Sequence, residues 1–67
     1  MDEEIKVNDR YYVEIINIGE QGDAVAKVNG MVVFIKDNTL SIGDKVNIEI
    51  TKVLPKFGFA VVIPDEE

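Results

Sequence analysis

The residues of this chain whose type and spacing could do chemistry are its three phenylalanines. Phe57 and Phe59 alternate around Gly58, and Phe34 lies in an earlier apolar segment. Alternate residues of a β-strand point to the same face of a sheet, so the rings of Phe57 and Phe59 would lie together. Outward-facing rings beside lysine side chains would form a platform for unpaired nucleobases, because base–aromatic stacking contributes roughly 1–3 kcal/mol per base.

The same spacing also fits a hydrophobic core, since large aromatic side chains fill the interior of small barrels. Several valines and isoleucines already supply core candidates, and Gly58 leaves one face of its segment bare, so that a ligand or another backbone could approach closely. For Phe57 and Phe59 both interpretations stay open. Tyr11 and Tyr12 are predicted to belong to the core.

The sequence lacks the side chains that most often serve in catalysis and metal binding. The chain has no histidine and no cysteine, which removes the commonest general base, the commonest metal ligand and any disulfide. Asp23 and Asp44 each follow a glycine, a pattern that favours a turn entering a strand over a pair of catalytic carboxylates. We therefore predict that the chain is not an enzyme and has no catalytic residue, metal site or cofactor.

The acidic charge is concentrated at the two ends. The formal net charge is −6, from 7 basic and 13 acidic residues. Six of the acidic residues lie within residues 2–4 and 65–67, which leaves seven against seven in between. We expect acidic tails at 1–6 and 64–67 around one domain at 7–63. The tails are either solvated ends or an acidic arm that competes with phosphate for lysines, and the neutral body predicts that any nucleic-acid binding is modest and relies on stacking.

No targeting or membrane segment is predicted. The first residues are acidic, unlike the positive start of a signal peptide. The longest apolar runs are far shorter than the ~20 residues that cross a bilayer. We expect a cytoplasmic protein that does not contact membranes.

Apolar residues recur with a period of two, which indicates strands rather than helices. Asn29-Gly30 joins two apolar segments and predicts a hairpin, because both residues tolerate the positive φ of a type I′ turn. Pro55 fits a turn before the last strand. Short strands at this spacing predict an all-β fold, a small five-stranded antiparallel β-barrel of OB-like type. The expected strands are 11–18, 24–28, 31–35, 45–51 and 57–63.

Blocks distributed along almost the whole chain resemble the TRAM domain family. The blocks are Gly22 to Gly30, Val32 to Ile35, Gly43 to Val46, Ile50 to Val53 and Phe57 to Ala60. The resemblance implies a small OB-like barrel that binds RNA. Members of this family are parts of enzymes that modify tRNA and rRNA, and others are stand-alone archaeal proteins that resemble cold-shock proteins in their role as RNA chaperones.

The resemblance also implies which residues bind RNA. The stacking aromatics of the family correspond to Phe34, Phe57 and Phe59, and a basic residue corresponds to Lys27. Met31 stands where the family often has an aromatic residue, and a methionine can pack on a base. Further lysines would neutralise nearby phosphates, and these are Lys36, Lys52 and Lys56.

We therefore expect an RNA chaperone that acts as a monomer and binds single-stranded or structured RNA (tRNA, rRNA or mRNA) with low sequence specificity. One alternative is a protein-interaction or dimerisation module that uses the same aromatic face, since exposed aromatic side chains also mark protein interfaces. Another is a carrier domain acylated on Lys45, because Asp44-Lys45 resembles the hairpin of lipoyl carriers.

Overall fold

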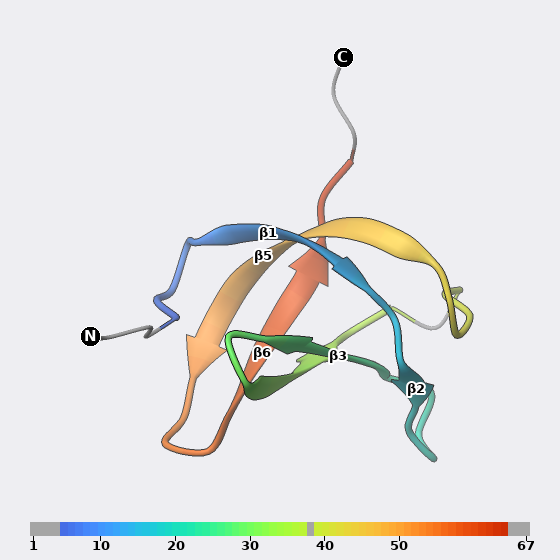
Figure 1. Ribbon diagram of the computed structural model, residues 1–67, viewed down its shortest axis with the longest axis horizontal. Helices are drawn as coiled ribbons and strands as arrows, with labels where there is room; N and C mark the ends of the chain where they lie inside the picture. Colours follow the sequence, from blue (N-terminus) through green and yellow to red (C-terminus); the bar gives the residue numbers. More distant parts are fainter. Residues whose placement is uncertain (1–4, 38, 65–67) are drawn as a thin grey trace.

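The computed structural model describes residues 5–37 and 39–64, and within these ranges it contains strands and no helix (Figure 1). No helix that could cross a membrane therefore occurs in this part of the chain. The strands follow one another along the chain in the order that the alternating apolar pattern predicts, which confirms the all-β class. The strands are β1 (Arg10–Glu14), β2 (Asn17–Ile18), β3 (Ala24–Val28), β4 (Met31–Ile35), β5 (Lys45–Val53) and β6 (Phe57–Val62).

The strands form one curled sheet in the order β1-β5-β6-β4-β3-β2 (Figure 1). Its two outermost strands are consecutive in the chain. The amide of Ile15 still donates to Asp44 O (2.8 Å), on the β5 side, whereas the amide of Ile16 donates to Val25 O (2.9 Å) in β3. The predicted strand 11–18 is thus one bent segment that changes partner between these residues. This bend joins the two edges, confirms the OB-like barrel and explains why six strands stand where five were predicted.

One strand pair differs from the antiparallel arrangement that we predicted. Strand β6 lies between β5 and β4, and it runs antiparallel to β5 but parallel to β4. Because β6 fills the gap between two segments that already run in opposite directions, it must be parallel to one of them. The prediction of a purely antiparallel barrel was therefore wrong for the pair β4 and β6.

The hairpin between β3 and β4 has the predicted turn. Asn29 and Gly30 both have positive φ, 53° and 84°, as a type I′ turn requires. The turn pairs Val28 with Met31 and fixes the register of the whole hairpin up to Ala24 and Ile35.

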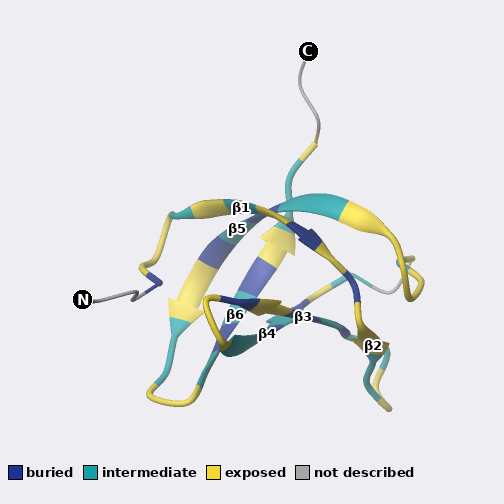
Figure 2. Cartoon of the chain, in the orientation of Figure 1, coloured by how far each residue is buried: buried dark blue, intermediate teal, exposed yellow. Residues whose placement is uncertain are grey.

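The core lies inside the curl of the sheet (Figure 2). Its largest fully buried side chains are Ile15, Val33, Ile35, Ile48 and Ile50, and small residues such as Ala24 and Ala60 fill the space between strands. Ile5 is also buried, with 4% of its surface exposed, although it falls in the segment predicted as a tail. Contact with the core thus begins before residue 7. The acidic residues of the two predicted tails, 2–4 and 65–67, lie outside the described residues.

The two adjacent tyrosines have different environments. Tyr11 packs against the core and its hydroxyl donates to Asp9 Oδ2 at 3.2 Å; burial, and then the Asp9 carboxylate, raise the pKa of Tyr11. Tyr12 is 67% exposed, so its assignment to the core was wrong. Neighbouring residues of a strand point to opposite faces, which prevents both rings from reaching one core.

Candidate nucleic-acid interface

The three phenylalanines lie on the outer face of the barrel. They belong to β4 and β6, which are neighbours in the sheet, and Phe34 is paired with Phe59. The residues that alternate with them, Val33 and Gly58, are buried on the inner face, whereas the three rings are half-buried and are not part of the core cluster. We call Phe34, Phe57 and Phe59 the aromatic cluster.

The rings of the aromatic cluster pack on one another. The ring centroids of Phe34 and Phe57 are 5.6 Å apart and those of Phe57 and Phe59 are 5.5 Å apart, both in edge-to-face geometry with interplanar angles of 82° and 84°. The rings of Phe34 and Phe59 are 5.9 Å apart and tilted by 37°. These separations are within the favourable range for aromatic pairs. The contacts hold the rings in fixed orientations while each keeps part of its surface in solvent.

A β-bulge in β5 brings a lysine beside the cluster. The pairing of β5 with β6 shifts between Ile50 and Lys52, so Thr51 is the extra residue of the bulge. As a result Lys52 pairs with Phe59 on the outer face, whereas an uninterrupted ladder would place Thr51 there. The Thr51 hydroxyl instead donates to Phe59 O at 3.3 Å.

Gly58, the glycine between the two phenylalanines, allows the backbone of the bulge to approach β6 closely. A Cβ atom on Gly58 would lie 3.2 Å from the carbonyl oxygen of Lys52. The close approach that the bare position predicts is therefore made by another backbone, that of β5.

Three more of the predicted lysines lie on or directly next to β3, β4 and β6, and all are exposed. The Nζ of Lys36 lies 6.0 Å from the ring centroid of Phe59, at the outer limit of a cation–π contact. Lys27 pairs with Val32, which in turn pairs with Phe57, and its exposure between buried neighbours places it on the same outer face. Lys56 lies in the turn directly before Phe57.

Met31 is the predicted site residue that the fold places elsewhere. The Asn29-Gly30 turn sets it opposite Val28, a core position, and it is partly buried against the core cluster. Its sulfur would lie 3.9 Å from a Cβ atom on Gly58, on the inner face of β6. The structure therefore places seven of the eight predicted residues on or next to the outer face at the aromatic cluster, and it places Met31 on the inner face of the sheet.

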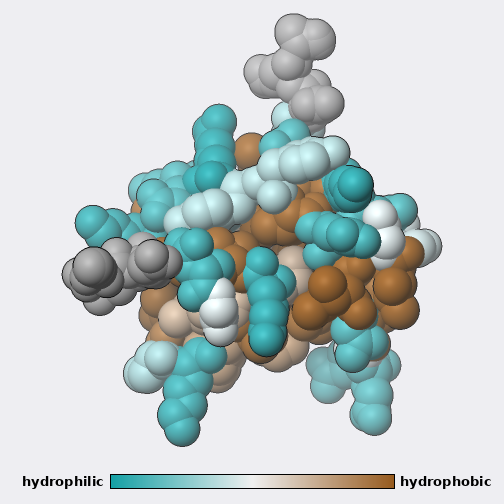
Figure 3. All heavy atoms as spheres, viewed as in Figure 1, coloured by the Kyte–Doolittle hydropathy of each residue, from teal (hydrophilic) through white to brown (hydrophobic). Residues whose placement is uncertain are grey.

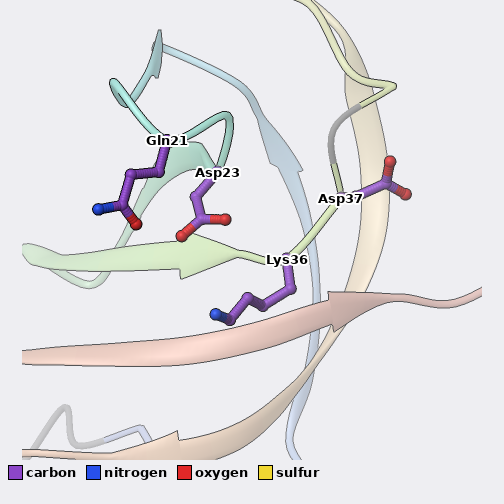
Figure 4. Close-up of a pocket in the computed structure, with 4 residues that line it drawn as sticks. All are labelled: Gln21, Asp23, Lys36 and Asp37. Atoms are coloured by element: carbon purple, nitrogen blue, oxygen red, sulfur yellow. The ribbon is translucent and has the colours of Figure 1, made fainter.

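Two shallow hollows next to the cluster escaped our sequence prediction. One is lined by Phe34 and four loop residues, which are Gly19, Glu20, Gln21 and Asp23, and the other is lined by Gln21, Asp23, Lys36 and Asp37 (Figure 4). The signal for them lay in the hairpin. The turn at Asn29-Gly30 pairs Ala24 with Ile35, and this pairing brings the residues that flank them, Asp23 and Lys36, to the same end of the hairpin.

Apolar side chains also reach the surface away from the aromatic cluster. Ile16 is 50% exposed and Ile42 is 63% exposed, and their chain neighbours are joined by a hydrogen bond from the Gly43 amide to Ile15 O (2.8 Å). Figure 3 shows exposed apolar side chains between hydrophilic ones on the face turned to the viewer. Among the described residues, no group of three potential acidic, histidine or cysteine ligands gathers to hold a metal ion.

The sequence is similar to known proteins over almost its whole length. The family model for the TRAM domain matches residues 4–63. Ribosomal RNA large subunit methyltransferase E of Methanosarcina barkeri is 40% identical over 58 residues, which is 87% of this chain. The enzyme of the same name from Methanococcoides burtonii is 42% identical over 65 residues, or 94% of this chain. The chain spans only 21% and 24% of the length of these two relatives.

A solved structure resembles the fold as a whole. The solution structure of a conserved protein of Methanococcus maripaludis superimposes with a TM-score of 0.79 at 32% sequence identity. The match covers 90% of this chain and 83% of that protein, so the likeness extends over the entire barrel.

Proposed function

This chain belongs to the TRAM domain family, whose members generally bind RNA, and from that premise we propose that it is a single-stranded RNA-binding protein of low sequence specificity. Unpaired bases stack on Phe34, Phe57 and Phe59, and nearby lysines neutralise phosphates. The proposal assigns binding and not catalysis to these residues. The methyltransferase activity in the names of the relatives stays with those proteins, of which this chain matches only a fraction.

The observation that carries the proposal is the position of the aromatic cluster. Three half-buried rings on the outside of a barrel leave apolar surface in water, although the core is filled by aliphatic side chains. Exposed lysines stand around the rings, and the acidic Glu49 on the same sheet is paired with Arg10 (Nε to Oε1, 3.6 Å). Stacking tolerates every base because each has a flat π-face, which suits binding without a strong sequence preference.

Such a surface would act as an RNA chaperone by mass action. A protein that binds unpaired bases, and not paired ones, shifts an RNA hairpin towards its open form, as any ligand shifts an equilibrium towards the state that it prefers. We propose that the protein works in this way as a monomer in the cytoplasm, on tRNA, rRNA or mRNA. The names of the methyltransferase relatives make ribosomal RNA the first candidate to examine.

The experiment is a titration of a labelled, unstructured oligonucleotide with the wild type and with the double variant Phe57→Ala, Phe59→Ala. Because each stacked base contributes roughly 1–3 kcal/mol, we expect the double variant to bind at least about tenfold more weakly. Tyr12→Ala is the matched control, since it removes an exposed ring outside the aromatic cluster and should leave the affinity unchanged. Equal affinities for the wild type and a folded double variant would show that the cluster does not bind RNA.

The second candidate function is a protein-interaction or dimerisation module. It would use the same aromatic cluster, because exposed aromatic side chains are also common at protein interfaces, and exposed Ile16 and Ile42 add apolar surface outside the cluster. Light scattering with and without RNA separates the two functions. A stable dimer that ignores RNA would support the interaction module, and a monomer that gains mass with RNA would support the binding protein.

A further inference from the structure

The loop before β3 forms a wall beside the aromatic cluster. The Gly19 amide donates to Asp23 O (2.8 Å) and the Gly22 amide donates to Gly19 O (3.0 Å), which closes the loop on itself. Gly22 has a φ of 94°, a conformation that glycine adopts without strain. The loop is thus held by its own backbone, and Asp23 has a fixed position at the start of β3.

The hairpin register places the Asp23 side chain on the outer face. Ala24 is fully buried and pairs with Ile35, so the residues next to them, Asp23 and Lys36, emerge on the side of the aromatic cluster. Asp23 lines both hollows, the one against Phe34 and the one against Lys36. In Figure 4 the side chains of Gln21 and Asp23 extend from the loop towards β4, whereas Asp37 points away from them.

Among the described residues, the two polar side chains that line both hollows, Gln21 and Asp23, have free hydrogen-bonding capacity. Within residues 5–37 and 39–64, no hydrogen bond or ion pair engages the Asp23 carboxylate or the Gln21 amide. Asp37 differs, because its carboxylate already accepts from the Thr39 amide (2.9 Å) and the Thr39 hydroxyl (2.6 Å). A free acceptor beside an aromatic ring is the arrangement that reads the edge of a stacked base.

We propose that Asp23 gives this site a preference for guanine at the position that stacks on Phe34. A carboxylate accepts hydrogen bonds at two oxygens and donates none. Guanine presents two adjacent donors on its Watson–Crick edge, N1–H and the N2 amine, which match the two oxygens. Uracil presents carbonyl oxygens on both sides of its single donor, and these face the carboxylate unfavourably. Adenine and cytosine offer one amine donor each. Lys36 lines the neighbouring hollow, which shares Gln21 and Asp23 with the hollow at Phe34, and from there it can donate to the O6 of the same guanine.

This inference rests on the proposed RNA binding and adds a preference at one base position. A bidentate pair discriminates against the wrong base by about 1–3 kcal/mol, and the open hollow places this site at the lower end of that range. The expected preference is therefore about fivefold. A preference of this size at one position is compatible with low overall specificity.

The experiment compares four labelled RNA ligands that differ at one position, measured by fluorescence anisotropy. They are a hexamer of uridines and the same hexamer with one guanosine, one inosine or one adenosine at the third position. Inosine lacks only the N2 amine, so it tests whether both donors are used. We expect the guanosine hexamer to bind about fivefold more tightly than the uridine hexamer, and inosine to lose much of this advantage.

The variant Asp23→Asn tests the residue itself. It keeps the side-chain size but replaces one acceptor oxygen with a donor, so the ratio of guanosine to uridine affinity should fall to about one. Glu14→Gln is the matched control, since it removes the same charge from an exposed position on β1 and should keep the ratio.

The two proposals fail in different ways. Equal binding of all four hexamers by a wild type whose affinity still depends on Phe57 and Phe59 would overturn the guanine preference alone. A preference that survives in Asp23→Asn would overturn the role of Asp23. If no hexamer binds, the proposed function falls and the preference falls with it.

Discussion

Substituting Gly58 with alanine tests how the bulge and the aromatic cluster fit together. The new Cβ atom would lie 3.2 Å from the carbonyl oxygen of Lys52, closer than ordinary van der Waals contact, and next to Met31 and Val33 on the inner face. The oxygen belongs to the backbone of a paired strand, so it has little freedom to move. The strand β6 must therefore shift away from the bulge, and Phe57 and Phe59 move with it.

The magnitude follows from two opposing effects. Adding a methyl group to a well-packed interior costs about 1–3 kcal/mol. Replacing glycine with alanine where the backbone allows it stabilises by about 0.4–1 kcal/mol, because the unfolded chain loses entropy. We therefore expect Gly58→Ala to lower the free energy of unfolding by about 1 kcal/mol. For a domain of this size that loss corresponds to a fall in Tm of about 4–8 °C.

The assay is thermal unfolding followed by circular dichroism, with Gly19→Ala as the matched control. A Cβ atom on Gly19 would lie 3.5 Å from Asp23 O, which is ordinary contact, so the control should keep or slightly raise the Tm. An unchanged or higher Tm for Gly58→Ala, or an equal fall in both variants, would refute the reasoning about the bulge.

Two further predictions concern charge. When three of the four lysines near the rings contact phosphate, the slope of log K against log salt for single-stranded RNA should be about −2. Anisotropy titrations at several salt concentrations measure this slope, and a slope near zero would contradict the role of the lysines. The Thr39 hydroxyl and then the Thr39 amide lower the pKa of Asp37, so Asp37 stabilises the fold above its ordinary pKa and this contribution disappears as the pH falls through the lowered value. In Thr39→Val the NMR titration midpoint of Asp37 should rise, and an unchanged midpoint would show that the hydroxyl has no effect.

Local patterns in the sequence predicted most of the fold. The alternation of Val46, Ile48 and Ile50 and the turn at Asn29-Gly30 are local signals, because each depends only on residues that are neighbours in the chain. The partner change at Ile15 and Ile16 is not local, since it depends on where β3 and β5 lie in the closed barrel. The parallel pairing of β4 with β6 is non-local for the same reason.

The candidate site was predictable in its residue types but not in its assembly. Periodicity placed Phe57 and Phe59 on one face and left open which face it was. The answer depends on the pairing of β6 with its neighbours, which sets Ala60 opposite buried Ile50 in β5 and Gly58 opposite buried Val33 in β4, so the two rings face outward. Met31 shows the converse: its type suited a binding surface, but the register of the hairpin directs it inward.

The parallel contact between β4 and β6 has a consequence for synthesis of the protein. Phe34 reaches the aromatic cluster from the β3–β4 hairpin, whereas Phe57 and Phe59 come from the last strand, so the cluster joins two parts of the chain that leave the ribosome at different times. A nascent chain that ends before β6 has one of the three rings and an unfilled gap between β4 and β5. The surface that we propose to bind RNA is therefore complete only when β6 closes the barrel, so we expect a growing chain to gain this surface in one step.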